Sequence, residues 1–202
     1  MRHQVLVADP PWGFGDGLAK MKRKVRRSAA SQYRTMTPQQ VAAMPVREIV
    51  DPDRCLLALW VPGVLLEDGL MVMHAWGFRL KQVFVWVKLK KQYAKEADWN
   101  RGTRVGMGRL FRQSHEIALI CTSGKKSIYP LLQDRSQRSV AFDLNLGHSC
   151  KPATLQKRLD KMFPTAQKAE LFARRQMPGW SCLGDGIDGK DICTAIHDLA
   201  AV

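Results

Sequence analysis

The chain has 202 residues, of which 46% are apolar, and this composition excludes a disordered chain and is typical of one domain with its own hydrophobic core. Thirty-two Lys and Arg residues against 18 Asp and Glu residues give a formal net charge of +14. Such an excess favours a polyanionic partner, most simply nucleic acid, although a basic protein without that partner remains an alternative. The five cysteines have no C-x-x-C pair and no ligand-like spacing, so we expect neither a metal site nor a disulfide framework.

An apolar run over residues 4–8 predicts a buried strand, and it ends at Asp9, Pro10, Pro11 and Trp12. Two consecutive prolines fix φ and remove two backbone donors, so the chain should leave the sheet as a stiff corner. Asp9 is then expected at the carboxyl end of a strand, where open α/β sheets bind their ligands. One carboxylate, carbonyl groups and a flat indole suit a planar group that carries an amino donor.

The segment after this corner is glycine-rich and then strongly basic. Residues 20–27 carry six positive charges in eight positions, and we expect a loop that is mobile until it binds phosphate. The candidate phosphate contacts in it are Lys22, Arg23, Lys24, Arg26 and Arg27. A solvated loop without a ligand is the alternative reading.

The later elements alternate between strands and helices. Thr37, Pro38 and Gln40 predict a capped helix that reaches about residue 44. Further on we expect strands at 54–60, 78–89, 115–122, 139–144 and 170–173, helices at 62–75 and 153–163, a turn over 178–186 and at most a short helix after residue 190. This alternation predicts an α/β fold, with a mostly parallel sheet covered by helices on both faces. The longest apolar run, residues 55–73, is interrupted by Pro62, Glu67 and Asp68, so we expect no membrane span.

Several segments resemble the adenine-N6 methyltransferases named after the seventy-kilodalton catalytic subunit of the messenger-RNA methylating enzyme, a family that includes many bacterial and phage DNA methyltransferases. The resemblance rests on residues 8–12 (Ala-Asp-Pro-Pro-Trp), 33–37, the expected strand 54–60 with Trp60, 84–88, 148–152 (His-Ser-Cys-Lys-Pro), 170–174 (Glu-Leu-Phe-Ala-Arg) and 178–184. They occur in family order across nearly the whole chain.

The resemblance implies a Rossmann-like fold over residues 1–202, in which the catalytic motif precedes the cofactor-binding strand. It implies S-adenosylmethionine as methyl donor and adenine in nucleic acid as acceptor, with Asp9, Pro10, Pro11 and Trp12 as the catalytic corner. The positions that match the family's cofactor residues are Lys151, Arg174, Gln176 and Asp185. Family members usually carry Asn at the last of these positions, and a carboxylate there still accepts hydrogen bonds from ribose hydroxyls.

The sequence is compatible with several alternatives. We expect DNA as the substrate because the chain is compact and lacks additional RNA-binding segments; an RNA methyltransferase and an inactive nucleic-acid-binding subunit of the same fold are the alternatives. Tyr33 is either a substrate contact in the active site or a packed loop residue, and Trp86 and Trp180 are expected in the core. The resemblance fits a monomer or homodimer in the cytoplasm of a bacterium or a phage-infected host cell.

Overall fold

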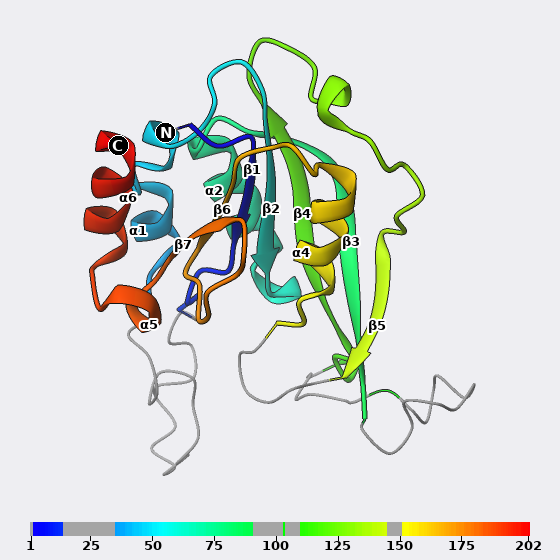
Figure 1. Ribbon diagram of the computed structural model, residues 1–202. Coiled ribbons are helices and arrows are strands. Elements are labelled where there is room, and N and C mark those ends of the chain that lie inside the picture. The colour runs from blue at the N-terminus through cyan, green and yellow to red at the C-terminus, as the bar shows by residue number, and fades with distance from the viewer. Residues whose placement is uncertain (1, 14–34, 91–102, 104–109, 145–150) are drawn as a thin grey trace, which may run out of the picture.

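The computed structural model describes residues 2–13, 35–90, 103, 110–144 and 151–202. Its centre is a seven-stranded sheet with the strand order β5-β3-β4-β2-β1-β6-β7 (Figure 1). The strands are β1 (Val5–Ala8), β2 (Cys55–Val61), β3 (Arg79–Leu89), β4 (His115–Ser123), β5 (Val140–Leu144), β6 (Lys168–Leu171) and β7 (Trp180–Leu183). The amino-terminal strand β1 therefore lies inside the sheet, between β2 and β6.

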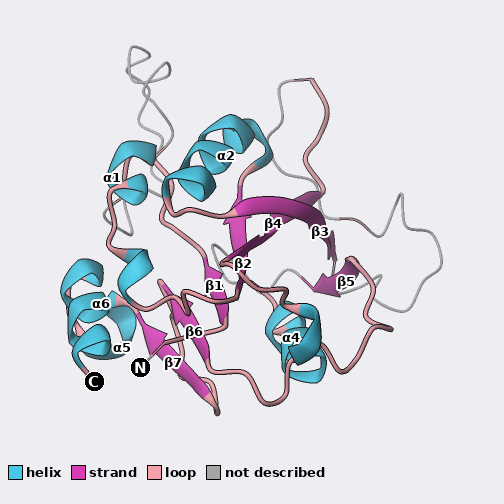
Figure 2. Cartoon of the chain, turned by 90° about the horizontal axis from the view of Figure 1, so that it is seen from above, coloured by secondary structure: helices cyan, strands magenta, loops and turns pink. Residues whose placement is uncertain are grey.

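Helices cover both faces of this sheet (Figure 2). They are α1 (Pro38–Ala42), α2 (Leu66–Ala75), α4 (Thr154–Met162), α5 (Asp185–Asp188) and α6 (Ile192–Ala201). One hydrophobic cluster joins the sheet to α1, α2 and α6, and a second cluster joins the opposite face to α4. Among the described residues, no helix has the length and apolar character that crossing a bilayer requires.

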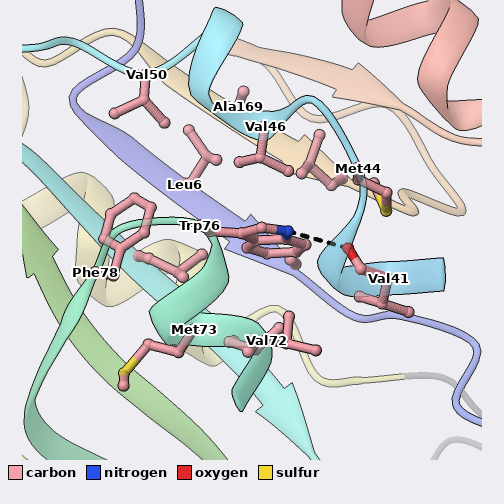
Figure 3. Close-up of a cluster of buried hydrophobic side chains, with 14 of the residues drawn as sticks. Leu6, Val41, Met44, Val46, Val50, Val72, Met73, Trp76, Phe78 and Ala169 are labelled. Carbon is pink, nitrogen blue, oxygen red and sulfur yellow. Dashed lines mark hydrogen bonds between the residues drawn. The ribbon is translucent and has the colours of Figure 1, made fainter. Parts of the chain in front are cut away.

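The alternation of side chains along β1 explains why both faces are apolar. Leu6 and Ala8 belong to the first cluster, whereas Val5 and Val7 belong to the second. All four residues are fully buried, as expected for a central strand whose two faces are both covered. Figure 3 shows the first cluster, in which the Trp76 indole of α2 donates a 3.0 Å hydrogen bond to the backbone carbonyl of Val41 in α1.

The sheet is mostly parallel, as the sequence predicts, and β4 runs against its two neighbours. β4 pairs in antiparallel fashion with both β2 and β3, whereas β1, β6, β7 and the β3–β5 pair are parallel. The beginning of β4 consequently meets the ends of β2 and β3: Ile117 is opposite Val61, and Glu116 is opposite Trp86. This reversal brings a residue from the start of a strand to the edge where Asp9 follows β1.

The strand expected at 170–173 is β6 at Lys168–Leu171, the helix expected to reach residue 44 ends at Ala42, and three further predictions differ in the kind of element. The expected turn over 178–186 contains β7 and the short helix α5; β7 has only four residues, too few to display a two-residue period. The expected helix at 62–75 begins as a 3-10 turn and becomes α-helical at Leu66. The tail forms the ten-residue helix α6, which begins where the Asp191 side chain accepts hydrogen bonds from the backbone N–H groups of Cys193 and Thr194.

Candidate active site

The corner that follows β1 is fixed by backbone hydrogen bonds. The backbone N–H of Trp12 donates to the Pro10 carbonyl at 2.8 Å, and the N–H of Met36 donates to the Pro11 carbonyl at 2.8 Å. The Trp12 indole N–H donates to the Trp60 carbonyl at the end of β2, at 2.9 Å. The corner is therefore bound to two other segments of the chain, which holds Asp9 in place at the carboxyl end of β1.

Trp12 is largely a core residue. Only 5% of it is exposed, and it packs in the same cluster as α1 and α2 while one part of it lines a cavity beside Asp9. So little exposed surface leaves a limited area on which a base can stack. Stacking of the substrate on Trp12 stays a prediction, and the clearest role of this indole is to anchor the corner to β2.

A cavity of about 230 Å³ opens beside Asp9 at the carboxyl edge of β1. Pro10 and Pro11 form part of its wall, and charged side chains come to it from four other parts of the chain. These charged residues are Lys88 at the end of β3, Glu116 in β4, Lys151 before α4 and Arg174 after β6. The cavity is thus assembled from segments that are far apart in sequence.

The centre of the cavity is a chain of alternating charges. The Lys151 ammonium donates to both oxygens of Asp9, at 2.8 Å and 2.9 Å. The same Nζ lies 3.1 Å from Glu116 Oε2 and 5.6 Å from the centre of the Trp60 ring. Lys88 forms an ion pair with the other oxygen of Glu116. Two carboxylates and two ammonium groups therefore balance one another beside the corner that follows β1.

Burial and charge act in opposite directions on this network. Burial disfavours the ionised form of Glu116, but Lys151 and Lys88 outweigh it, so the pKa of Glu116 lies below its ordinary value. Burial likewise disfavours the charged form of Lys151, and the carboxylates of Asp9 and Glu116 reverse this effect and raise the pKa of the ammonium. Glu116 and Lys151 are consequently both charged at neutral pH.

The residues expected to hold the cofactor fall into two groups. Lys151 and Arg174 line the cavity with Asp9, whereas Gln176 and Asp185 are exposed and lie outside its lining. Asp185 immediately follows Gly184 at the carboxyl end of β7, one strand away from β6. Tyr33 and the basic residues Lys22, Arg23, Lys24, Arg26 and Arg27 lie outside the described residues.

The donor set fits S-adenosylmethionine. Lys151 and Arg174 are cations beside the cavity and suit a carboxylate, and Asp185 has the oxygens that ribose hydroxyls require.

Glu170 of β6 has one oxygen, Oε2, that is buried without a hydrogen bond in the described structure, while its Oε1 accepts from Gln156. Burial raises the pKa of Glu170. An unused buried acceptor of this kind is suited to a polar group of a bound molecule.

Sequence reasoning gave no role to Lys88 and Glu116, although the structure places both in the cavity wall. Their signal in the sequence is a charged residue near one end of an apolar strand: Lys88 follows Val87, and Glu116 precedes Ile117. For β4 this charge stands at the beginning of the strand. Its position becomes meaningful only when the antiparallel direction of β4 is known.

Comparison with known proteins identifies the class to which this fold and this corner belong. The MT-A70 family model matches residues 3–186, and the chain therefore belongs to the MT-A70 family of methyltransferases. Its alternating β/α order and mostly parallel sheet are those of a Rossmann-like methyltransferase fold.

The chain is similar in sequence to several individual methyltransferases. The chain is 28% identical to the Type II methyltransferase M.MunI of Mycoplasma sp over 91% of its own length and 77% of that protein. It is 26% identical to the N(6)-adenosine-methyltransferase MT-A70-like protein of Arabidopsis thaliana and 25% identical to the human N(6)-adenine-specific methyltransferase METTL4. Both alignments include over 90% of this chain, but they cover only 24% of the Arabidopsis thaliana protein and 37% of METTL4.

Proposed function

We propose that this protein transfers a methyl group from S-adenosylmethionine to the exocyclic N6 amine of adenine in DNA. The observation that carries the proposal is Asp9, a carboxylate held at the carboxyl end of β1 beside a charged cavity in a chain of the MT-A70 family. Relatives with adenine N6 methyltransferase names, such as METTL4, support the acceptor.

In this proposal the corner activates the amine by accepting its hydrogens. The lone pair of the adenine amine is delocalised into the ring, so the amine is a poor nucleophile. Asp9 has lone pairs beyond those that Lys151 occupies, and the Pro10 carbonyl has one beyond the bond from Trp12. If both accept an amine hydrogen, the nitrogen is held in the pyramidal form, and these bonds strengthen as positive charge develops on it. The nitrogen loses one of these hydrogens as a proton after methyl transfer, so the step needs no strong general base.

The cofactor, when bound, supplies an electrophilic methyl group on a sulfonium sulfur. In this proposal Lys151 and Arg174 bind its carboxylate end, Asp185 accepts from its ribose, and Gln176 contacts it from the segment after β6. Neutralisation of Lys151 by two carboxylates is compatible with a site that also has to accept a sulfonium charge.

The test is methyl incorporation from tritiated S-adenosylmethionine into oligonucleotides, followed by digestion to nucleosides to identify the methylated position. Wild-type protein is expected to give N6-methyladenine. Asp9→Asn keeps the shape of the side chain and should lose at least about 100-fold in turnover, the effect of removing one charged transition-state contact. Absence of any methylated adenine with the wild-type protein would favour the inactive nucleic-acid-binding subunit.

DNA is preferred to RNA because M.MunI, a Type II methyltransferase, is matched over 77% of its length, whereas the plant relative with an adenosine methyltransferase name is matched over 24%. RNA is the second candidate because that name and several others refer to adenosine. Matched DNA and RNA oligonucleotides of one sequence distinguish the two substrates. Faster methylation of the RNA would reverse the assignment.

The basic residues at 20–27 are proposed to bind phosphates of the nucleic acid. Replacing Arg23, Lys24, Arg26 and Arg27 by Ala should weaken DNA binding similarly for all sequences. Each lost phosphate contact reduces the slope of log affinity against log salt by about 0.9. Cofactor affinity should stay unchanged. A quadruple variant with the wild-type affinity and slope would exclude this segment as the phosphate-binding element.

A further inference from the structure

Glu116 is the one acidic residue of the cavity wall, apart from Asp9, in the described structure, and the mechanism above gives it no role. We propose that Glu116 is a positioning residue that takes over the Lys151 ammonium while Asp9 binds the target amine. The inference rests on the proposed function, because it assigns the amine to Asp9. It makes Glu116 act through Lys151 and without a contact to the substrate.

The first step of the argument is competition at Asp9. Lys151 Nζ lies 2.8 Å and 2.9 Å from the two carboxylate oxygens, so the ammonium engages both of them. A carboxylate that is paired with an ammonium group attracts a further donor less strongly, and positive charge that develops on the amine is repelled by the same ammonium. Asp9 is therefore fully effective only when Lys151 moves away from it.

The second step is the cost of moving a buried charge. The side chains of Asp9 and Lys151 are each only 16% exposed. An ammonium group that leaves one anion in such a place needs another anion, because an unpaired buried charge is strongly unfavourable. The cofactor carboxylate that Lys151 is proposed to bind is present only with the cofactor, whereas Glu116 is a permanent anion of the protein. Glu116 Oε2 is already 3.1 Å from Lys151 Nζ, so the ammonium reaches its second partner with a small displacement.

The third step is that Glu116 is itself held in place. Its other carboxylate oxygen pairs with Lys88, whose Nζ lies 5.3 Å from the centre of the buried Trp86 ring. Trp86 stands opposite Glu116 in the β3–β4 ladder, so both partners of this pair come from adjacent strands. The two ammonium groups keep Glu116 ionised, as its lowered pKa indicates. A fixed, ionised acceptor is what the transfer of Lys151 requires.

The experiment is a double-mutant cycle between positions 116 and 151 in the full chain. Glu116→Gln keeps the size of the side chain and removes its charge, and Lys151→Met removes the ammonium. Steady-state turnover (kcat) and KM are measured with tritiated cofactor and an oligonucleotide that wild-type protein methylates. Glu67→Gln, at an exposed position in the first turn of α2, is the matched control and should have wild-type turnover.

Glu116→Gln alone is expected to lower turnover about tenfold or more, with the KM for S-adenosylmethionine changed by less than about threefold. In the Lys151→Met background the same substitution should change turnover less than about twofold, because there is no ammonium left to receive. An equal loss in both backgrounds would mean that Glu116 contacts the substrate itself, and it would overturn the proposal.

Two further arms keep the test decisive. If Glu116→Gln does not fold, Glu116→Asp replaces it, because the shorter carboxylate lies farther from Lys151 and its defect must also vanish with Lys151→Met. If Lys151→Met has no measurable turnover, the same cycle is evaluated from dissociation constants for the oligonucleotide. Wild-type protein without any adenine methylation would refute the proposed function, whereas an active wild type with no coupling between the two positions refutes only the role of Glu116.

Discussion

Substitution of Gly184 by Ala tests how closely the ends of β6 and β7 must approach. The backbone of Gly184 is extended, with φ 168°, so its conformation is open to any residue and the constraint is purely steric. A Cβ at this position would lie 2.3 Å from the Ala173 carbonyl oxygen and 2.8 Å from the Ala173 nitrogen. Because non-bonded carbon atoms have an optimal contact distance of about 3.5 Å, the backbones at Ala173 and Gly184 would have to separate by roughly 1 Å.

The expected loss of stability follows from this displacement. Overpacking costs about 1–3 kcal/mol, and loss of the 2.8 Å hydrogen bond from Ala173 N–H to the Leu183 carbonyl adds about 1 kcal/mol. For a domain of this size each kcal/mol lowers Tm by about 2–4 °C, so we expect a decrease of roughly 4–16 °C. Because Arg174 and Asp185 adjoin this contact, the affinity for S-adenosylmethionine should also fall.

Gly186→Ala is the control, because the nearest atom to its added Cβ is the Cα of Arg174 at 4.0 Å, and its position in α5 favours Ala. Thermal unfolding gives Tm for both variants, and calorimetry well below Tm gives their cofactor affinity. Gly186→Ala should match the wild-type protein or exceed its stability. A Gly184→Ala variant with wild-type Tm and affinity would refute the steric reasoning.

Three other positions give independent tests. Thr37 caps α1 through its bond from the Gln40 N–H, so Thr37→Ala should lower the free energy of unfolding by about 1 kcal/mol, measured by urea denaturation; Thr37→Ser, which keeps the hydroxyl, should not. Trp12→Phe removes the donor to the Trp60 carbonyl and should cost about 1–3 kcal/mol in the same assay, and a smaller change would mean that the indole N–H does not anchor the corner. Burial lowers the pKa of His3, whose ring lies between the Ile49 carbonyl and the Ser181 hydroxyl, so stability should be fully present above about pH 6.5 and should fall as pH drops from there toward the lowered pKa. His3→Gln should flatten this decrease, and an unchanged pH profile would exclude His3 as its source.

Much of the fold could be predicted because its central strands are buried on both faces. β1 and β2 are continuous apolar runs, and the capping box that begins α1 is present as Thr37 and Gln40 predict. Trp86 and Trp180 are in the core as expected, at 2% and 7% exposure. These features depend on local sequence and burial, which a single chain displays directly.

The parts that could not be predicted depend on long-range pairing. The sequence indicated Lys151 as a cofactor residue, and its contact with Asp9 joins positions 142 residues apart that only the tertiary structure brings together. Glu116 lies in the cavity wall because β4 runs antiparallel to β2, and no local sequence pattern specifies the direction of a strand. The short strand β7 lies in register with β6, and its four residues were too few to distinguish it from a turn.

The central position of β1 also bears on how the chain is made. Val5–Ala8 leaves the ribosome before both of its neighbours in the sheet: the parallel partner β2 follows after about 50 residues, and the other partner β6 follows only at Lys168–Leu171. At a synthesis rate of about 5–20 residues per second, β6 is synthesised on the order of ten seconds after β1, and the edge of β1 that pairs with β6 is unpaired during this time. During that interval an apolar strand has an unpaired edge, which other nascent chains or a chaperone can bind. Slower elongation would lengthen this exposure, so the yield of folded protein should depend on the rate of translation between β2 and β6.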